Sequence, residues 1–183
     1  MKKLFTITMA LVAFTISAQN VTFGAKAGLN LASMVGDDAE GLDGRTSFHI
    51  GATAEFEISE SFSIQPELLY SGQGYTADED VTGKVDYINL PVMAKFYVAD
   101  GFSVEAGPQI GFLASAKADV NGESVDIKDT LKSTDFAFNI GAGYEVGSGL
   151  NLGLRYSMGL TDVEDDSNGF KHSVFLLSIG YNF

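Results

Sequence analysis

The sequence has no cysteine and no tryptophan, and only three of its 183 residues are proline. Without cysteine, the chain forms no disulfide and offers no thiolate to zinc, to an iron–sulfur cluster or to nucleophilic catalysis. Basic residues are also scarce, because 11 Lys and Arg stand against 24 Asp and Glu and give a formal net charge of −13. Nucleic-acid binding needs basic residues that displace phosphate counterions. The composition therefore argues against a nucleic-acid partner.

A long hydrophobic run is missing from most of the chain, since no stretch of 18 or more apolar residues follows residue 18. No membrane-spanning helix is therefore predicted there. Residues 1–18 have the features of a secretory signal peptide: Lys2 and Lys3 come first, an apolar stretch follows, and the small residue Ala18 precedes the expected cut. The alternative is a buried N-terminal helix. We expect removal of 1–18 and a single domain over 19–183.

Alternation of apolar and polar residues dominates the remaining sequence. Phe48, Ile50 and Ala52, for example, alternate with His49 and Gly51. A period of two is the signature of β-strands, and no helical period competes with it. The pattern predicts eight strands, at about 21–34, 46–58, 62–75, 84–98, 102–116, 133–147, 150–161 and 171–183.

Short and long connections alternate between these predicted strands. The short ones are 59–61, 99–101 and 147–149, and the long ones are 35–45, 76–83, 117–132 and 162–170. All short turns then lie at one end of an antiparallel sheet and all long loops at the other, as in outer-membrane barrels. The prediction is an all-β fold, an eight-stranded antiparallel up-and-down transmembrane β-barrel closed by its first and last strands.

On each strand, alternate residues form an apolar set on one face and a polar set on the other. The same alternation would suit a soluble barrel of the lipocalin type, in which the apolar set points inward. Three features favour a membrane barrel. The polar set is rich in glycine, which suits a narrow lumen, and the apolar set contains no charge, which suits hydrocarbon. Aromatic residues also gather near the short turns, as in an interfacial girdle. These aromatic residues are Phe56, Phe62, Phe96, Phe102, Tyr144, Tyr181 and Phe183.

Three segments resemble PorT-like outer-membrane β-barrel proteins: residues 24–31 (GAKAGLNL), 88–97 (INLPVMAKFY) and 178–183 (SIGYNF). The resemblance covers the chain after residue 18. It implies a barrel of OmpA or OmpX size with no common enzymatic site, and one branch of the family supports secretion or gliding machinery. In the last segment, Tyr181 and Phe183 look like the aromatic signal that the barrel-assembly machinery reads.

Charged residues of the polar set point into the predicted lumen. An eight-stranded barrel encloses only enough room for side chains, and buried charges need partners. We therefore expect an internal ion network that plugs the barrel, with a charged pore lining as the alternative. Because carboxylates outnumber cations, some Glu should be wet or protonated. The proposed network comprises Lys26, Glu55, Glu57, Glu67, Lys95, Glu105, Glu145 and Arg155. Prolines 66, 91 and 108 fall within strands, where we expect local bulges.

The predicted long loops contain most of the 24 acidic residues. A solvated, mutually repelling surface that contacts an extracellular or envelope protein is the main interpretation. Weak binding of divalent cations is the alternative, because carboxylates suit Ca²⁺ and Mg²⁺ and residues 119–123 (DVNGE) partly resemble a calcium loop. The acidic residues are Asp37, Asp38, Glu40, Asp43, Asp78, Glu79, Asp80, Asp119, Glu123, Asp126, Asp129, Asp162, Glu164, Asp165 and Asp166.

Candidates for catalysis are few, because the chain has only two histidines. His49 is expected to form hydrogen bonds in the lumen and His172 to lie at the rim. His172 and Ser173 are adjacent and point to opposite faces of a strand, which is poor geometry for a nucleophile and its base. Asp162 or Asp165 with His172 remains an acidic-protease alternative on spacing alone.

We therefore expect a monomeric, non-catalytic barrel, exported to the outer membrane of a Gram-negative bacterium and surrounded by its lipid. Its predicted roles are envelope structure, surface interaction or support of a secretion or envelope assembly. A narrow channel is the first alternative and a lipid- or peptide-cleaving enzyme the second. No cofactor and no resident metal site are predicted.

Overall fold

The computed structural model of the chain describes residues 21–36, 39, 41–77, 81–120, 123–163 and 170–183. The predicted signal peptide lies outside these residues and stays a prediction. No helix in the described part of the chain is long and apolar enough to cross a membrane. The elements are β1 (Val21–Val35), β2 (Leu42–Ser59), β3 (Phe62–Ala77), β4 (Val81–Ala99), β5 (Phe102–Val120), β6 (Glu123–Asp126), the 3-10 helix η1 (Lys128–Thr130), β7 (Thr134–Val146), β8 (Leu150–Gly159) and β9 (Lys171–Asn182).

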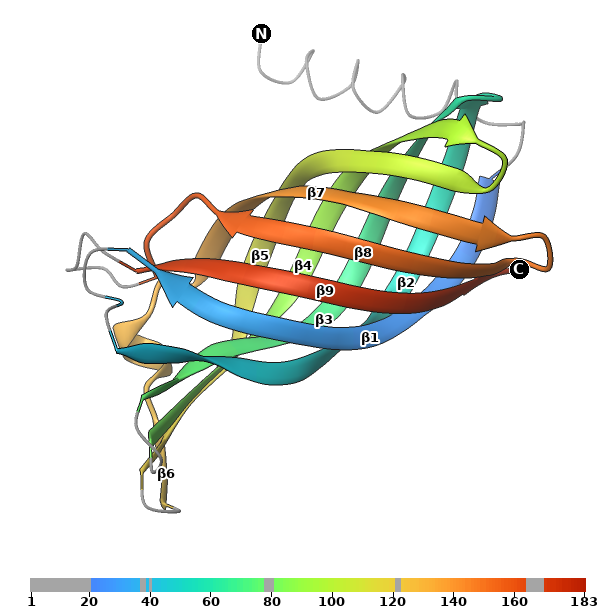
Figure 1. Cartoon of the computed structure of the whole chain (residues 1–183). Helices are drawn as coiled ribbons and strands as arrows, with labels where there is room; N and C mark the ends of the chain where they lie inside the picture. Colours follow the sequence, from blue (N-terminus) through green and yellow to red (C-terminus); the bar gives the residue numbers. More distant parts are fainter. Residues whose placement is uncertain (1–20, 37–38, 40, 78–80, 121–122, 164–169) are drawn as a thin grey trace, which may run out of the picture.

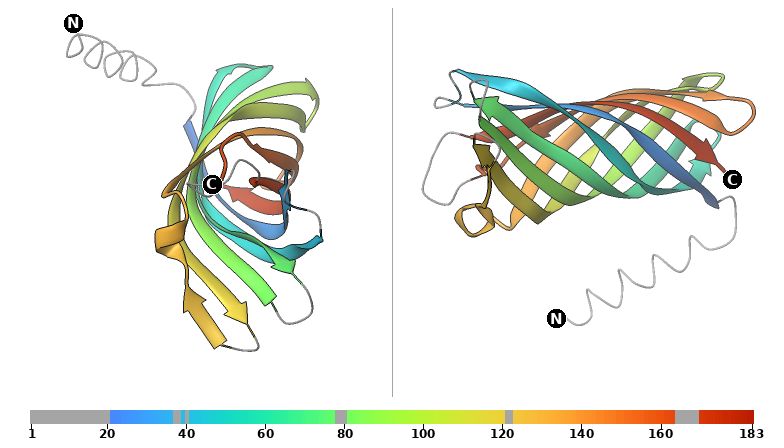
Figure 2. Two further views of the ribbon diagram at one scale, coloured as in Figure 1. Left: turned by 90° about the vertical axis from the view of Figure 1, so that its left-hand side faces the viewer. Right: turned by 90° about the horizontal axis from the view of Figure 1, so that it is seen from below.

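The strands close into an antiparallel barrel with strong tilt (Figures 1 and 2). Strands β1 to β5 and β7 to β9 form the wall, β1 pairs with β9, and β4 pairs with β5. The short strand β6 adds only to the outer end of β5. The prediction of eight wall strands, closed by the first and the last, is confirmed.

The three prolines lie in the wall without shifting its register, so the predicted bulges at these positions are wrong. Pro66 is paired with Val92, Pro91 with Gln109 and Pro108 with Phe138, in the same register as the pairs on both sides. Proline has no N–H and therefore costs a ladder hydrogen bond, but its extended backbone suits a strand. Register shifts occur elsewhere, for example between Asp86 and Tyr87 of β4.

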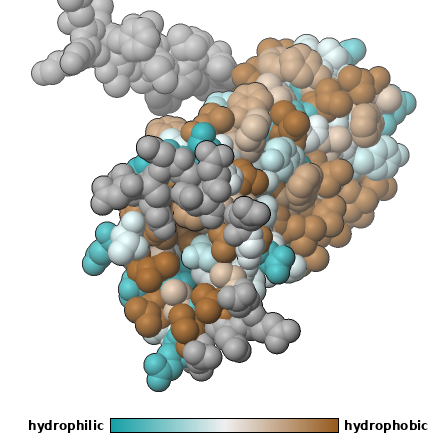
Figure 3. Space-filling view, turned by 60° about the vertical axis from the view of Figure 1, so that its left-hand side comes forward, coloured by the Kyte–Doolittle hydropathy of each residue, from teal (hydrophilic) through white to brown (hydrophobic). Residues whose placement is uncertain are grey.

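The outer surface of the wall is apolar and the interior is polar. Leu29, Ile50 and Leu177 are each about half exposed, whereas Glu67 and Arg155 are only 4% exposed. Figure 3 shows brown, hydrophobic residues over much of the barrel wall. A soluble barrel with an apolar interior is therefore excluded, and the outward-facing side chains form the band that a hydrocarbon environment requires.

Aromatic side chains lie toward both ends of this band. At the short-turn end, Phe62 and Phe96 stack with ring centroids 4.8 Å apart. Toward the opposite end, Phe48 and Tyr70 approach to 5.7 Å, and Phe175 forms a similar pair with Tyr156 at 4.6 Å. Only the group at the short-turn end was predicted from the sequence. Two girdles are the expected arrangement at the two interfaces of a bilayer.

The short turns lie where the sequence predicts them, but the strands at the other end are longer than expected. Residues 117–132, predicted to be a loop, include the end of β5, all of β6 and η1. Val120 pairs with Glu123, so a hairpin is formed there and projects beyond the barrel (Figure 2). The sequence between the paired residues is Asn121-Gly122, a dipeptide typical of tight hairpins, but a loop was predicted here.

An arginine on the outer face should destabilise the barrel according to its depth. We expect Leu177→Arg, in the middle of β9, to cost about 2–4 kcal/mol in the free energy of unfolding. The matched substitution Val98→Arg, near the short-turn end of β4, should cost only about 0–1 kcal/mol because the side chain reaches the interface. Urea titration in lipid vesicles, read by the gel mobility of folded and unfolded barrel, measures both. Equal costs at the two positions would contradict the depths in the bilayer that are assigned to Leu177 and Val98.

Candidate functional site

Arg155 of β8 lies at the centre of a buried ion network in the lumen. Its guanidinium donates to both carboxylate oxygens of Glu67, at 2.8 and 2.9 Å, and also to Glu105 Oε1, at 3.0 Å from Nε and 2.9 Å from Nη2. Glu67 lies on β3, which is not a sheet neighbour of β8. The bidentate pair therefore spans the lumen and joins opposite walls of the barrel.

A glycine makes this reach possible. Gly141 of β7 pairs with Glu105 on one side and with Arg155 on the other. A Cβ atom at Gly141 would lie 2.6 Å from the carbonyl oxygen of Leu154 and 3.1 Å from Glu105 Oε1. A larger residue would therefore crowd the site where the guanidinium crosses β7 to meet Glu105.

Two lysines extend the network. Lys26 donates to Glu67 at 2.9 Å, and Lys95 donates to Glu55 at 2.6 Å. Gln65 connects the two groups, because it accepts a hydrogen bond from Lys95 at 3.2 Å and donates to Glu67 at 2.6 Å. The connection through Gln65 was not predicted, although the residue shares the inward parity of Glu67.

Glu55 also receives hydrogen bonds from two hydroxyl groups. Ser63 donates at 2.5 Å, and the hydroxyl of Tyr97 donates to the same carboxylate. Neither residue was predicted as part of the site. Charge-assisted bonds of this kind satisfy the lone pairs that the lysine leaves free. The carboxylate of Glu55 is therefore well compensated although it is buried.

The network is balanced in charge, with three cations paired to three carboxylates. Two of the predicted members lie outside it. Glu57 is exposed at the short-turn end, and Glu145 is partly exposed and accepts a hydrogen bond from Asn182 at 3.2 Å. The two carboxylates in excess, Glu57 and Glu145, thus lie near solvent at the end of the barrel. Only the glutamates deeper in the lumen are paired with cations.

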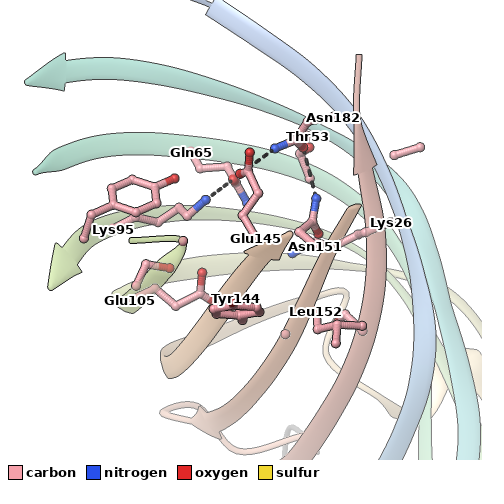
Figure 4. A pocket seen from close by; sticks show the side chains of 17 residues that line it. Lys26, Thr53, Gln65, Lys95, Glu105, Tyr144, Glu145, Asn151, Leu152 and Asn182 are labelled. Atoms are coloured by element: carbon pink, nitrogen blue, oxygen red, sulfur yellow. Dashed lines mark hydrogen bonds between the residues drawn. The ribbon is translucent and has the colours of Figure 1, made fainter. Parts of the chain in front are cut away.

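Little empty space remains beside the network. A cavity of about 40 Å³ lies between Lys26, Lys95 and Glu145 at the short-turn side of Arg155. Figure 4 shows these side chains converging from several strands, with Asn151 and Asn182 closing the group through a hydrogen bond. A cavity of this volume has room for a few water molecules but not for a larger solute.

A second polar layer lies on the long-loop side of the network. His49 contacts Asn30 Oδ1 at 2.7 Å through Nδ1 and Ser178 Oγ at 2.9 Å through Nε2. Asn30 in turn donates to the carbonyl oxygen of Gly72 at 2.7 Å. The predicted role of His49 as a hydrogen-bonding lumen residue matches this geometry. These bonds link β1, β2, β3 and β9 across the interior.

The prediction that His172 lies at the rim is wrong. Its side chain is buried inside the barrel, with 2% of the residue exposed. Its Nε2 lies 3.2 Å from the hydroxyl of Tyr87, and the two rings meet edge to face at 5.2 Å. The hydroxyl of Ser173 instead meets that of Tyr156 at 3.0 Å, on the other face of the strand. Of the two proposed acidic partners, Asp165 lies outside the described residues, and no hydrogen bond joins Asp162 to His172 within them.

Within the described residues, no group of three or more His, Asp or Glu side chains could hold a metal ion. The segment that resembles a calcium loop, 119–123, lies partly outside the described residues, and its described members Asp119, Val120 and Glu123 pair within the projecting hairpin of β5 and β6. Asp119 on this hairpin forms an ion pair with Lys84 and accepts a hydrogen bond from Ser124. These two interactions hold the pKa of the Asp119 carboxyl below its ordinary value, so this carboxylate already has its partners.

Tyr181 and Phe183 lie at the short-turn end with their rings 5.8 Å apart. The N–H of Phe183 donates to the carbonyl oxygen of Phe23 at 2.8 Å, which ties the last residue to β1. Both side chains are exposed on the outer face of the barrel. Their recognition by the assembly machinery stays a prediction.

Removing Arg155 should leave two buried carboxylates short of a partner. We expect Arg155→Met to lower the free energy of unfolding by about 3–5 kcal/mol, the usual cost of breaking a buried ion pair on one side. Glu57→Gln is the matched control, since Glu57 is exposed and its substitution should stay within about 0.5 kcal/mol. Urea titration in vesicles compares the two. If both variants unfold like the parent protein, the network does not contribute to stability.

The closed barrel is similar to solved outer-membrane proteins. It matches Ail, the attachment invasion locus protein of Yersinia pestis, at 16% identity and a TM-score of 0.59, over 90% of this chain and 100% of Ail. Neisserial surface protein A matches at 12% identity and a TM-score of 0.62, again over 90% of this chain and all of the other. At these identities the likeness shows the fold alone. A search of curated proteins found no match.

The sequence itself matches a family of barrel domains. The match extends from residue 17 to residue 165 and therefore covers most of the described strands. It agrees with the closed wall, the apolar outer face and the polar lumen described above. The chain belongs to the family described as "Outer membrane protein beta-barrel domain", and it is an outer-membrane protein in contact with lipid.

Proposed function

We propose that this protein is a non-catalytic, monomeric barrel that anchors an interaction surface in the outer membrane and conducts no solute. The observation that carries the proposal is the ion network across the lumen. Arg155 and Glu67 join opposite walls at hydrogen-bond distance, and Lys26 and Glu105 complete the group. An eight-stranded barrel has room only for side chains. Here the side chains of the network cross the middle of the lumen.

The absence of a reactive arrangement among the described residues supports a non-catalytic role. His172 contacts a tyrosine rather than a nucleophile, and His49 contacts Asn30 and Ser178. A hydrolytic site needs a nucleophile, a base and an accessible position for the substrate. Both histidines are nearly fully buried, so a lipid or peptide has no access to them.

The outer end is the part of the molecule that we assign to function. Its connections are acidic in sequence, and β5 and β6 project there as a hairpin (Figure 1). A structure of Ail contains the heparin analogue sucrose octasulfate, which is an anion. An acidic surface would repel such a ligand, so we propose a basic protein surface as the partner. The PorT-like resemblance supports an envelope or secretion assembly as its source.

Conductance tests the blocked lumen. In planar bilayers, we expect the parent protein to show no steady ion conductance at neutral pH. The triple variant Lys26→Ser, Glu67→Ser and Arg155→Ser removes the centre of the network and should conduct small ions if it folds, as judged by its gel mobility. Glu57→Ser at the exposed end is the control and should stay silent. Steady conductance by the parent protein would move the assignment to a narrow channel.

Affinity for anionic and cationic surfaces tests the outer end. We expect the protein in detergent to pass a heparin column without retention at moderate salt, because its formal net charge is −13. A column of immobilised basic protein should retain it at low salt, and the triple variant Glu123→Gln, Asp126→Asn and Asp129→Asn should elute earlier. Retention on heparin, or unchanged elution of the variant, would contradict the proposed partner chemistry.

A further inference from the structure

An apolar pocket lies at the long-loop end of the barrel, on the opposite side of the ion network from the short turns. Its volume is about 300 Å³. The walls come from the ends of β1 and β3, the starts of β2 and β4, and the segments that follow β6 and β8. The lining includes Met34, Tyr75, Ala77, Val85, Leu131 and Val163.

The inward-facing side chains change character along the barrel. Within the wall they are polar or charged, as the network of Arg155 shows. Toward the long-loop end they become apolar, because Val85 and Leu113 are buried on β4 and β5, and Ile127 and Leu131 pack against them. Apolar side chains are unfavourable next to the water at a barrel mouth. An apolar lining at this position therefore indicates an interaction or ligand-binding site.

A register shift helps to form this lining. Val85 pairs with Ala116, but Tyr87 pairs with Leu113, so the β5 strand contains one extra residue between these pairs. As a result, both Leu113 and Ala116 are buried on the inner side, which regular alternation would not allow. A bulge of this kind re-aims side chains and is a designed feature of many barrel rims.

Few apolar side chains remain in the neighbouring connections to fill the pocket. The pocket's walls include residues next to the segments 37–38, 40, 78–80 and 164–169, and these segments contain only Asp, Glu, Ser, Asn and Gly. An apolar cavity of about 150 Å³ can stay dry and bind benzene. A cavity of 300 Å³ is about twice that size and is in the range of ligand sites.

We propose that this pocket binds a neutral apolar molecule with a chain or ring system of about ten carbon atoms, by comparison with benzene in the smaller cavity. Two hydroxyl-bearing residues in the lining, Tyr75 and Thr130, suit a ligand with one polar end. The acidic connections around the pocket disfavour a carboxylate on that ligand. The ligand class is thus a medium-chain alcohol or a similar uncharged amphiphile, and the site is independent of the blocked lumen.

Methyl NMR of the whole protein in lipid nanodiscs tests this site, with 1-decanol as the probe. We expect the methyl signals of Met34, Leu131 and Val163 to shift and saturate as decanol is added. The methyl groups of Leu177 and Ile179 on the lipid face report partitioning into the bilayer and should change linearly. Pocket signals that only follow the lipid-face signals would overturn the proposal.

Two variants separate binding in the pocket from binding elsewhere. Ala77→Trp fills the pocket and should weaken decanol binding at least tenfold, whereas Ala118→Trp on β5, outside the pocket lining, should bind like the parent protein. If Ala77→Trp fails to fold by gel mobility, Thr130→Trp replaces it. Decanoate should bind at least tenfold more weakly than decanol. Unchanged affinity in a folded filling variant, or equal affinity for decanoate, would overturn the assignment.

Discussion

The inability of hydrocarbon to form hydrogen bonds is the constraint on which the rest of this structure depends. Each backbone N–H and C=O in the membrane must find a partner within the protein, because an unpaired group costs several kcal/mol there. The wall meets this requirement by pairing β1 with β9, so that no edge remains. Proline is tolerated at three wall positions because its extended backbone keeps the register and only a single donor is lost at each.

Closure with only eight strands creates the second condition, a lumen too narrow for bulk water. Charged residues inside it must then compensate one another. Arg155 does so with two glutamates from different strands, and Gly141 leaves the space for this contact. The network is therefore a consequence of barrel size as much as of residue choice. A wider barrel with the same residues could leave a hydrated channel.

The outer end follows different rules because it is not surrounded by lipid. There the strands run on beyond the aromatic residues of the second girdle, β5 continues into the hairpin with β6, and the inward face becomes apolar. Under the proposed function, the lumen that holds the ion network serves as an anchor and the partly apolar outer end as a recognition surface. This division explains why the family resemblance indicates architecture well and activity poorly.

The sequence by itself determined the number of wall strands, their inward and outward faces and the short turns, because the alternation of Phe48 to Ile58 or Leu150 to Leu160 has a single period and depends only on local geometry. It also identified most of the charged lumen residues by parity. Only the tertiary structure decided which charges meet. Glu57 has the same parity as Glu55, yet depth along a tilted strand places one at the solvent and the other beside Lys95. Depth and cross-lumen distance result from the stagger of all strands together, and no single segment contains that information. The same reason hid the apolar pocket, whose walls come from four strands and two connections far apart in the chain.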